Sequence, residues 1–518
     1  MILFEKKKMS FDSSGPSIAG RRGAALLGAA FFALILAAGC ASNPRGGTSA
    51  RPEARQDRPV DVAKPGSGQQ PAPSIEQPKP VPMSPWLQAA LASLSKKDLP
   101  GGAHLVVRRT PGRPLAAAEL CIVGQAGSLQ SGEDGAIALG LALLSRGKAG
   151  DKPGSLVHSI IAAGGKLEFK ELSYDAIALE LVAPPAALPG LLSALANALA
   201  DPAFASPSFS QAEFDAVMKD FRIRRLRESR DPGLRASDRL RSDIYRDHPY
   251  AGQPLGTEES LLSLTCAQVA ASWKARVGAE SIAISVVGDL DAEALAAVLA
   301  PAFEGLGTRG PAPVPAPALP IKDALLLEPM PGAQGAYIRV DFSAPDRASQ
   351  DYAVLSVALA MLDDVLMEEL RGREILAYGA YTRLSFAAAP SASIIVTRAA
   401  SAQAAKAGVE RSLAIVAGGS CLALDGSGYA PLAAAVGSYK SRTLARLYAG
   451  GESAAEMAEY LARDLAAGGD GSLWFRLADR INAVKAEDVL RLARTSFGST
   501  PKAWAIAAPP ELLAPLSK

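Results

Sequence analysis

Histidine and cysteine are both scarce in this 518-residue sequence. The three histidines, His104, His158 and His248, lie far apart, and no two have the spacing that lets side chains reach one metal ion. The four cysteines form no Cys-x-x-Cys pair. These absences exclude a metal site built from closely spaced histidine and cysteine, as in a zinc finger. We therefore expect structural or surface roles for the histidines, with His104 on a strand and His158 on a helix.

An excess of charge of one sign is also missing. The chain has 54 basic and 52 acidic residues, and its basic residues form no long tract. Nucleic-acid binding needs a basic surface, so this composition predicts no nucleic-acid partner. The sequence does have length and apolar content, because 49% of its residues are hydrophobic. That is enough for two or more packed cores.

The first 39 residues have the composition of an export signal peptide. A basic start precedes the apolar run GAALLGAAFFALILAAG, which ends at Cys40. The stretch LAAGC resembles a bacterial lipobox, which implies that Cys40 is lipidated and becomes the mature N-terminus. A single membrane-spanning helix is the alternative, although the run is shorter than the roughly 20 apolar residues such a helix needs. Ala41 is not the aspartate that often retains lipoproteins in the inner membrane, so we expect a lipid anchor in the bacterial cell envelope, on the periplasmic face of the outer membrane.

Besides Cys40, the predicted lipidation site, three cysteines remain after removal of the signal: Cys121, Cys266 and Cys421. They permit at most one internal disulfide, and the sequence does not select the pair. Buried free thiols are the alternative.

Two proline-rich stretches divide the chain. Residues 40–85 are mainly Pro, Gly, Ser, Gln and charged residues, which bury too little apolar surface to offset the entropy of ordering. We interpret them as a disordered tether. The stretch RGPAPVPAPALP lies in a predicted linker at 309–328. The two predicted domains are therefore residues 86–308 and 329–518.

Each half repeats a series of strands, a helix, a hairpin and further helices. In the first half, strands are predicted in GGAHLVVRRT, AAAELCIVGQAGS and ESIAISVVG, a hairpin in GKLEFKELSYDAIALELVA, and helices in GAIALGLALLSRG, LPGLLSALANALADPAF and SQAEFDAVMKDFRIRRLRESRD. In the second half, strands are predicted in DALLLEPM, GAYIRVDFSAP and AWAIAAP, a hairpin in AYGAYTRLSFAAAPSASIIVTRAA and a helix in DYAVLSVALAMLDDVLMEELR. The pattern predicts a duplicated α+β fold with helices on one face of antiparallel-rich sheets.

Five stretches, in order, resemble the insulinase/pitrilysin family of zinc metallopeptidases. They are VGQAGSLQSGEDGAIALGLALLSRG, IIAAGGKLE, HPYAGQPLGTEESLLSLT, ISVVGDLD and LRGREILAYGAY, of which HPYAGQPLG and LRGREILAY are the most specific. The resemblance implies two tandem ferredoxin-like α/β units that form half of a clam-shell chamber. It also implies a second insulinase-like subunit, in a homo- or heterodimer, and unfolded peptide as a ligand.

The family's zinc site is missing from the stretch that should contain it. The motif H-x-x-E-H places two zinc-binding histidines on one helical face, with a glutamate that activates the bound water. The resemblance aligns these three positions with Ala138, Leu141 and Ala142. A third ligand, a glutamate on a later helix, aligns near Lys219, beside Asp220. Zinc is expected for the family, but we assign no catalytic, metal or cofactor residue in this chain.

Two other family features are altered or kept. On the edge strand that receives substrate in the family, Glu168 and Phe169 stand where Asn-Ala is common. Backbone pairing with an extended peptide survives that change. Arg371 and Tyr378 match the pair that contacts the substrate carbonyl beside the zinc, a role that suits guanidinium and phenol groups. We retain them as candidate peptide contacts, with bracing of the helix-to-strand turn as the alternative.

Nine arginines lie between Arg222 and Arg246, interleaved with acidic residues. We interpret this segment as a solvated, salt-bridged helical face. A basic chamber wall that attracts acidic peptides is the alternative.

Together these features predict a non-catalytic family member, a lipoprotein that is a partner or peptide-binding subunit of an active zinc peptidase. An active zinc-dependent endopeptidase with atypical ligands is one alternative, although loss of the ligands and the base together removes the activated water. A structural envelope scaffold that keeps only the fold is the other.

Overall fold

The computed structural model describes residues 83–123, 133–146, 156–171, 175–246, 248–307, 321–423 and 425–517. All of them belong to the compact unit Lys79–Lys518. The predicted signal peptide, Cys40, nearly all of the predicted tether and the proline-rich part of the predicted linker lie outside the described residues. Within these ranges, no helix combines the length and the apolarity needed to cross a membrane.

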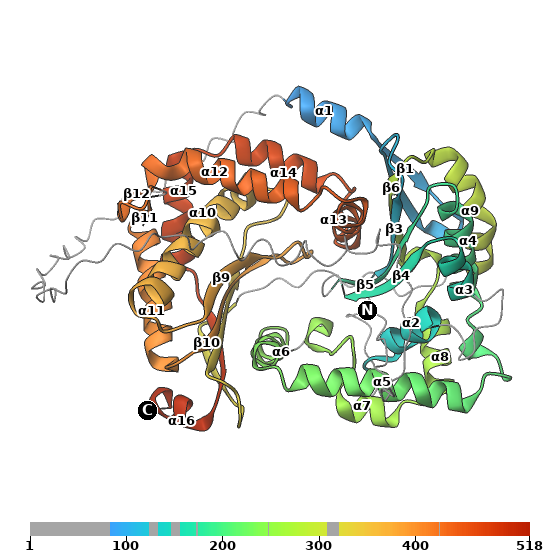
Figure 1. The fold of residues 1–518 in the computed structure, drawn as a ribbon, viewed down its shortest axis with the longest axis horizontal. Coiled ribbons are helices and arrows are strands. Elements are labelled where there is room, and N and C mark those ends of the chain that lie inside the picture. Colours follow the sequence, from blue (N-terminus) through green and yellow to red (C-terminus); the bar gives the residue numbers. More distant parts are fainter. Residues whose placement is uncertain are drawn as a thin grey trace, which may run out of the picture. The chain divides into compact units, whose positions relative to one another are not determined.

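The first half of the described chain forms a six-stranded mixed sheet in the order β1-β2-β6-β3-β5-β4 (Figure 1). β2 and β6 are parallel neighbours, and the other neighbouring pairs are antiparallel. The predicted hairpin is confirmed as β4 and β5. The strands are β1 (Leu94–Asp98), β2 (His104–Arg109), β3 (Ala116–Val123), β4 (Lys166–Glu171), β5 (Ala176–Ala183) and β6 (Ile282–Gly288).

The second half forms a five-stranded sheet in the order β7-β13-β8-β10-β9. β13, close to the C-terminus, is parallel to β7 and antiparallel to β8. β9 and β10 form the second predicted hairpin, and β7 overlaps the last residues of the predicted linker. The strands are β7 (Ala324–Pro329), β8 (Ala336–Ser343), β9 (Gly379–Leu384), β10 (Ser391–Ala399) and β13 (Ala503–Ala508), with a separate short pair β11 (Ser420–Leu422) and β12 (Tyr429–Pro431).

Helices begin where capping residues precede apolar stretches. The predicted polar helix is α5, which ends at Ser229; Asp231 then accepts a hydrogen bond from the Leu234 amide, and Pro232 begins α6. The helices of the first half are α1 (Pro85–Ala92), α2 (Ala136–Arg146), α3 (Leu156–Ala162), α4 (Leu188–Ala200), α5 (Gln211–Ser229), α6 (Pro232–Ile244), α7 (Glu258–Ser263), α8 (Cys266–Arg276) and α9 (Ala292–Leu306). Those of the second half are α10 (Gln350–Met367), α11 (Ala402–Ala417), α12 (Leu432–Ala449), α13 (Ala454–Ala466), α14 (Leu473–Asn482), α15 (Ala486–Ala493) and α16 (Pro510–Leu513).

Each sheet is covered on its second face by a helix from the other half of the chain (Figure 1). Helix α13 of the second half packs on β3 and β6, where Ala462 and Ala466 meet Ala178 and Cys121. Helix α6 of the first half packs on β13 and β8. From the sequence, helices were expected on only one face of each sheet. The difference arises because β3, β6 and β13 are buried on both faces, and small alanine side chains let these exchanged helices approach closely.

The three cysteines in the described residues are free thiols. Cys121 and Cys421 are buried, and the half-buried Cys266 thiol donates to the Phe204 carbonyl at 3.3 Å. Burial raises the pKa of the Cys421 thiol to about 11, so it is protonated at neutral pH. The disulfide that the sequence left open is therefore not formed.

Candidate functional site

Helix α2, which aligns with the family's zinc motif, is part of the first core. Ala138 and Leu141 are fully buried, and Ala142 packs against the same core. A Cβ at Gly140 would lie only 2.6 Å from the Trp273 ring of α8, so α2 is held close to its neighbour. The positions of the two histidines and the glutamate are therefore occupied by packed apolar side chains.

The facing helix α5 offers no carboxylate to this core. Its buried residues are all apolar, among them Phe214 and Phe221, whereas Lys219 and Asp220 are exposed. In the described part of the chain, no group of three or more His, Cys, Asp or Glu side chains is arranged to hold a metal ion. The residues at this position do not fit zinc, which needs three protein ligands in a catalytic site.

The histidines have other roles. His104 begins β2 and its Nδ1 lies 2.9 Å from Asp98 Oδ1, and His158 is exposed on α3, so both predicted placements are confirmed. His248 Nδ1 accepts a hydrogen bond from the Tyr250 amide at 3.1 Å, and the two rings meet edge to face.

The two glycine-containing motifs that resemble the family lie against each other. Gly135, just before α2, has φ +88°, and a Cβ there would lie 2.8 Å from Gly256 Cα. Gly256, at the end of HPYAGQPLG, also has a positive φ of +80°. Ser260 Oγ donates to the Asp134 carbonyl at 2.9 Å and closes the contact. Both motif glycines are thus needed because the backbones at Gly135 and Gly256 lie close together, and this contact involves no metal ligand.

β4 is an edge strand, as predicted. Among the described strands only β5 pairs with it, so its other edge has no strand partner. Glu168 forms an ion pair with Lys166 at 2.8 Å, and the Phe169 ring lies 5.9 Å from the Arg224 guanidinium carbon of α5. An extended peptide can therefore add to β4 by backbone hydrogen bonds, with α5 beside it.

The corresponding edge strand of the second sheet, β9, is blocked by side chains of α10. Asp363 Oδ1 accepts from the Thr382 amide at 2.6 Å, and Met367 Sδ accepts from the Ala380 amide at 3.5 Å. These amides are the ones a further strand would use. The two halves therefore differ, and β4 is the better place for strand addition.

The structure brings Arg371 and Tyr378 together. Arg371 lies in the π-helical turn Glu368–Arg373 after α10, and its guanidinium carbon is 5.9 Å from the Tyr378 ring. Arg398 of β10 approaches the same ring at 5.8 Å and donates to Tyr337 Oη at 3.3 Å. All three side chains at the ring are exposed, which suits contact with a ligand as well as bracing.

The backbone around this cluster is strained. Among the described residues other than glycine, only Ile375 and Arg398 have a positive φ, 49° and 51°. The loop and the β-bulge that contain them are joined by hydrogen bonds from Tyr378 to Thr397 and from Ala400 to Leu376. Such conformations cost on the order of 1–3 kcal/mol each and gather at binding sites.

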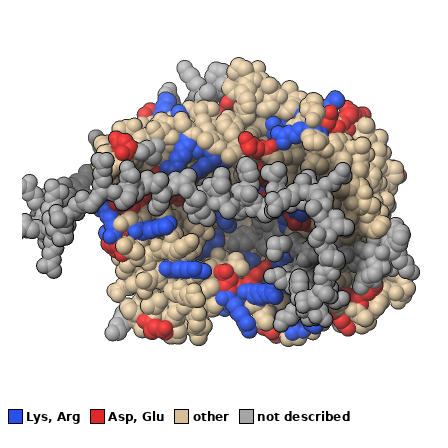
Figure 2. Space-filling view, in the orientation of Figure 1, with Lys and Arg blue, Asp and Glu red and all other residues tan. Residues whose placement is uncertain are grey.

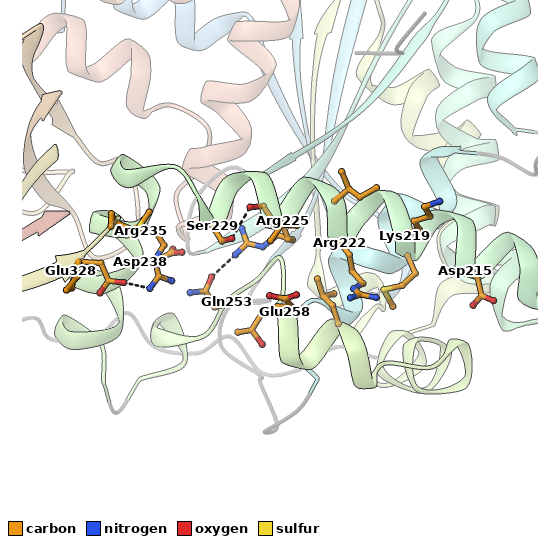
Figure 3. Close-up of a pocket in the computed structure, with 17 residues that line it drawn as sticks. Asp215, Lys219, Arg222, Arg225, Ser229, Arg235, Asp238, Gln253, Glu258 and Glu328 are labelled. Carbon is orange, nitrogen blue, oxygen red and sulfur yellow. Dashed lines mark hydrogen bonds and ion pairs between the residues drawn. The ribbon is translucent and has the colours of Figure 1, made fainter. Parts of the chain in front are cut away.

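A cavity of about 860 Å³ runs along α5 between α6, α7 and the end of β7 (Figure 3). Arg225 donates to Gln253 at 3.2 Å, and Arg235 pairs with Glu328. The cavity has as many carboxylates as basic side chains, namely Asp215, Asp238, Glu258 and Glu328 against Lys219, Arg222, Arg225 and Arg235. The formal charges of its lining therefore balance.

A second cavity, of about 580 Å³, lies between α5–α6 and the face of β8, β9 and β10. We call it the arginine cleft, because five arginines line it: Arg224, Arg225, Arg241, Arg339 and Arg383. The arginine-rich segment is salt-bridged, as predicted, but it is not wholly exposed to solvent. Arg241 is buried and forms an ion pair with Asp238 at 3.0 Å. Elsewhere the charges are interleaved, and the face drawn in Figure 2 shows no extended area of one sign.

Tyr250, in the HPY turn, ties the two halves together. Its hydroxyl donates to the buried Asp175, whose other oxygen accepts from the Ala388 amide of the β9–β10 hairpin at 3.0 Å. Burial and the nearby Asp175 charge raise the pKa of the Tyr250 phenol, which stays protonated as a donor.

We expect Tyr250→Phe to lower the free energy of unfolding by about 1–3 kcal/mol, because a buried carboxylate loses one hydrogen bond. Urea unfolding of the purified chain measures this change. Tyr448→Phe removes the hydroxyl of a more exposed tyrosine and is the matched control. Equal stability of the two variants would contradict a bracing role for Tyr250.

The residues that line the arginine cleft from β8 and β9 were not identified from the sequence. A signal was present: Tyr337, Arg339 and Asp341 alternate with apolar residues along β8, and Tyr381 and Arg383 are two residues apart on β9. Alternation of this kind places polar side chains on one face of a sheet. Arg398 had no such signal, because it lies in a bulge.

Comparison with known families gives one match. Residues 263–410 match the family described as "Peptidase M16 inactive domain", the class that includes the insulinase/pitrilysin peptidases. The match runs from the end of α7 into α11, so it does not include α2. No curated protein sequence matches the chain.

Solved structures share the fold. A "peptidase M16 inactive domain" from Pseudomonas fluorescens superposes with a TM-score of 0.66 at 20% identity, over 80% of this chain and 98% of that one. A chain of complex III2 from Candida albicans superposes with a TM-score of 0.64 at 14% identity, over 82% of this chain and 97% of that one. The periplasmic protease PqqL from Escherichia coli superposes with a TM-score of 0.60 at 15% identity, over 82% of this chain but only 48% of PqqL. In the structure of the first half of PqqL alone, 93% of that chain is covered.

Proposed function

We propose that this chain, an insulinase/pitrilysin-like protein of the M16 class with a degenerate zinc site, is a non-catalytic subunit that binds peptide beside an active partner. The observation that carries the proposal is the packing of α2. Ala138 and Leu141 are fully buried where a ligand and the base would stand, while one edge of the neighbouring β4 pairs with no other described strand. Peptide binding survives in such a site, whereas activation of water does not.

A second body is part of the proposal. The chain covers about half of PqqL and nearly all of the first half of PqqL, so it has the size of one body. A chain of complex III2, a multi-subunit assembly, shares the fold. Both comparisons support a partner subunit that supplies the other half of a chamber.

The bacterial envelope is the proposed location, through a lipid on Cys40. The support is the apolar run that ends in LAAGC, together with the likeness to a periplasmic protease. We expect Cys40→Ser to move the protein from the membrane fraction to the soluble fraction of lysed cells. Membrane association that persists in this variant would argue for a membrane-spanning anchor instead.

Affinity purification of the tagged, full-length lipoprotein from mildly cross-linked cells tests the partner role. Mass spectrometry should identify a second M16 chain that contains an intact H-x-x-E-H motif. Capture of structural envelope proteins alone would favour the scaffold alternative. Zinc near one ion per chain in the isolated protein, with chelator-sensitive peptide cleavage, would establish an enzyme with atypical ligands.

A further inference from the structure

The charge of the arginine cleft distinguishes it from the balanced cavity along α5. The cleft has three carboxylates, Glu228, Asp231 and Asp238, against its five arginines. All three carboxylates are engaged. Glu228 accepts from Arg224 at 2.8 Å and from Arg225 at 2.7 Å, Asp238 pairs with Arg241, and Asp231 caps α6. Asp341 pairs with Arg339 from beside the lining, so five arginines face four carboxylates. The cleft therefore has an excess of one positive charge inside a recess, where counter-charges concentrate.

Arg383 is the arginine most available to a ligand. It lies on the edge strand β9, its side chain is exposed, and no carboxylate pairs with it in the part of the chain that the structure describes. The other arginine that lines the cleft from this sheet, Arg339, is engaged with Asp341 at 2.9 Å and with Ser393.

The arginines and tyrosines form rows across the sheet. Arg339 and Tyr381 both lie opposite Ile395, and Asp341 and Arg383 both lie opposite Ser393. Tyr337, further along β8, lines the cleft and accepts a hydrogen bond from Arg398. A chain of contacts therefore links the cleft to the exposed cluster of Arg371, Tyr378 and Arg398.

The cleft is linked to β4 through Arg224. Arg224 lines the cleft, and its guanidinium carbon lies 5.9 Å from the Phe169 ring of β4. A chain that pairs with β4 by its backbone would thus lie beside a recess whose side-chain donors are guanidinium and phenol groups. Guanidinium groups bind carboxylates through two parallel hydrogen bonds, and neighbouring tyrosines add hydroxyl donors.

We infer that the arginine cleft selects acidic peptide segments and that Arg383 is a specificity-determining residue. The inference rests on the proposed peptide-binding function and names its ligand class. Side-chain carboxylates of Asp or Glu, two or so residues apart in an extended chain, would face Arg383 and the arginines across the cleft. The backbone supplies affinity at β4, and the cleft supplies the preference for charge.

Fluorescence anisotropy of the full mature chain tests the inference with two labelled peptides of equal length. One has Glu at alternate positions and the other has Gln there. We expect the acidic peptide to bind about tenfold more tightly at about 50 mM salt, with a smaller gap at about 500 mM, because salt screens charge. An oligophosphate of similar charge should compete more weakly, since it cannot pair with the β4 backbone.

Variants separate specificity from folding. Arg383→Gln should weaken binding of the Glu peptide much more than binding of the Gln peptide and so remove most of the preference, while Arg383→Lys keeps part of the preference. Arg494→Gln, at an exposed arginine directly after α15, should change the binding of neither peptide. Equal binding of the two peptides by the natural chain, or equal effects of Arg383→Gln and Arg494→Gln, would overturn the inference and leave peptide binding standing. Absence of binding by either peptide would instead refute the proposed peptide-binding function.

Discussion

Introduction of the inverted zinc motif into α2, by Ala138→His, Leu141→Glu and Ala142→His, should yield a destabilised protein that still cleaves no peptide. Leu141 is fully buried in the first core, so a glutamate there loses its hydration without gaining a partner. We expect the free energy of unfolding to fall by about 3 kcal/mol or more.

Catalysis stays absent because the third ligand is also missing. The α5 residues that face the core are apolar, and two histidines alone do not hold a catalytic zinc. Metal analysis after dialysis against zinc and a fluorogenic peptide assay measure both expectations. The double variant Ala138→His, Ala142→His keeps Leu141 and tests metal binding without the buried charge.

Leu262→Glu is the stability control, because Leu262 on α7 is 61% exposed and should accept a carboxylate with little effect. The opposite outcome is a triple variant that binds about one chelator-removable zinc ion per chain and hydrolyses peptide. That result would show that α2 still provides the geometry of a zinc site and is not only a packing surface.

A second large effect is expected at Glu119, in the centre of the first sheet. The side chain is fully buried beneath α13, and neither carboxyl oxygen has a hydrogen-bond partner among the residues that the structure describes. Burial raises the pKa of Glu119 to about 8, with Lys170 opposing and Glu180 adding to the shift. The other charged groups that face it are Glu459 and Arg463 of α13, which lies over this face of the sheet.

The raised pKa of Glu119 makes the folded protein less stable as the pH rises. Between pH 5 and 8 the unfolded chain has an ionised Glu119, whereas the folded chain keeps the proton. Unfolding then releases a proton, so this group lowers the free energy of unfolding by about 1.4 kcal/mol for each pH unit of increase. The loss is complete above pH 8, where both states are ionised.

Glu119→Gln removes this titration. The free energy of unfolding of the variant minus that of the natural chain should rise by about 3 kcal/mol from pH 5 to pH 7.5, measured by urea unfolding at several pH values. Glu304→Gln, at an exposed position on α9, should give a constant difference. A constant difference for Glu119→Gln as well would mean that Glu119 is ionised in the folded protein and held by Lys170.

Local patterns in the sequence account for most of the elements that form the two sheets. Both hairpins and the helix α2 follow from periodicity and from turn residues. The packing of α2 into the core was also predictable, because positions 138, 141 and 142 hold only small or apolar side chains.

The helix exchange was not predictable in the same way. A run such as IAISVVG in β6 indicates a strand buried on both faces, but it does not say which helix covers the second face. The arginine cleft is harder still, because its residues come from α5, α6, β8, β9 and β10, which only the tertiary structure brings together. Arg398 is positioned by a bulge, and a bulge breaks the alternation that would reveal it.

The exchange of α6 and α13 has a consequence for how the chain reaches its native state. The first sheet is complete once β6 has been made, yet its alanine-lined second face stays bare until α13 is made, long afterwards in the sequence. Contacts of such separation slow folding and leave apolar strands open to misassembly in the interval. A chain cut at the linker would leave one bare sheet face on each fragment, so the two duplicated halves fold as one cooperative unit.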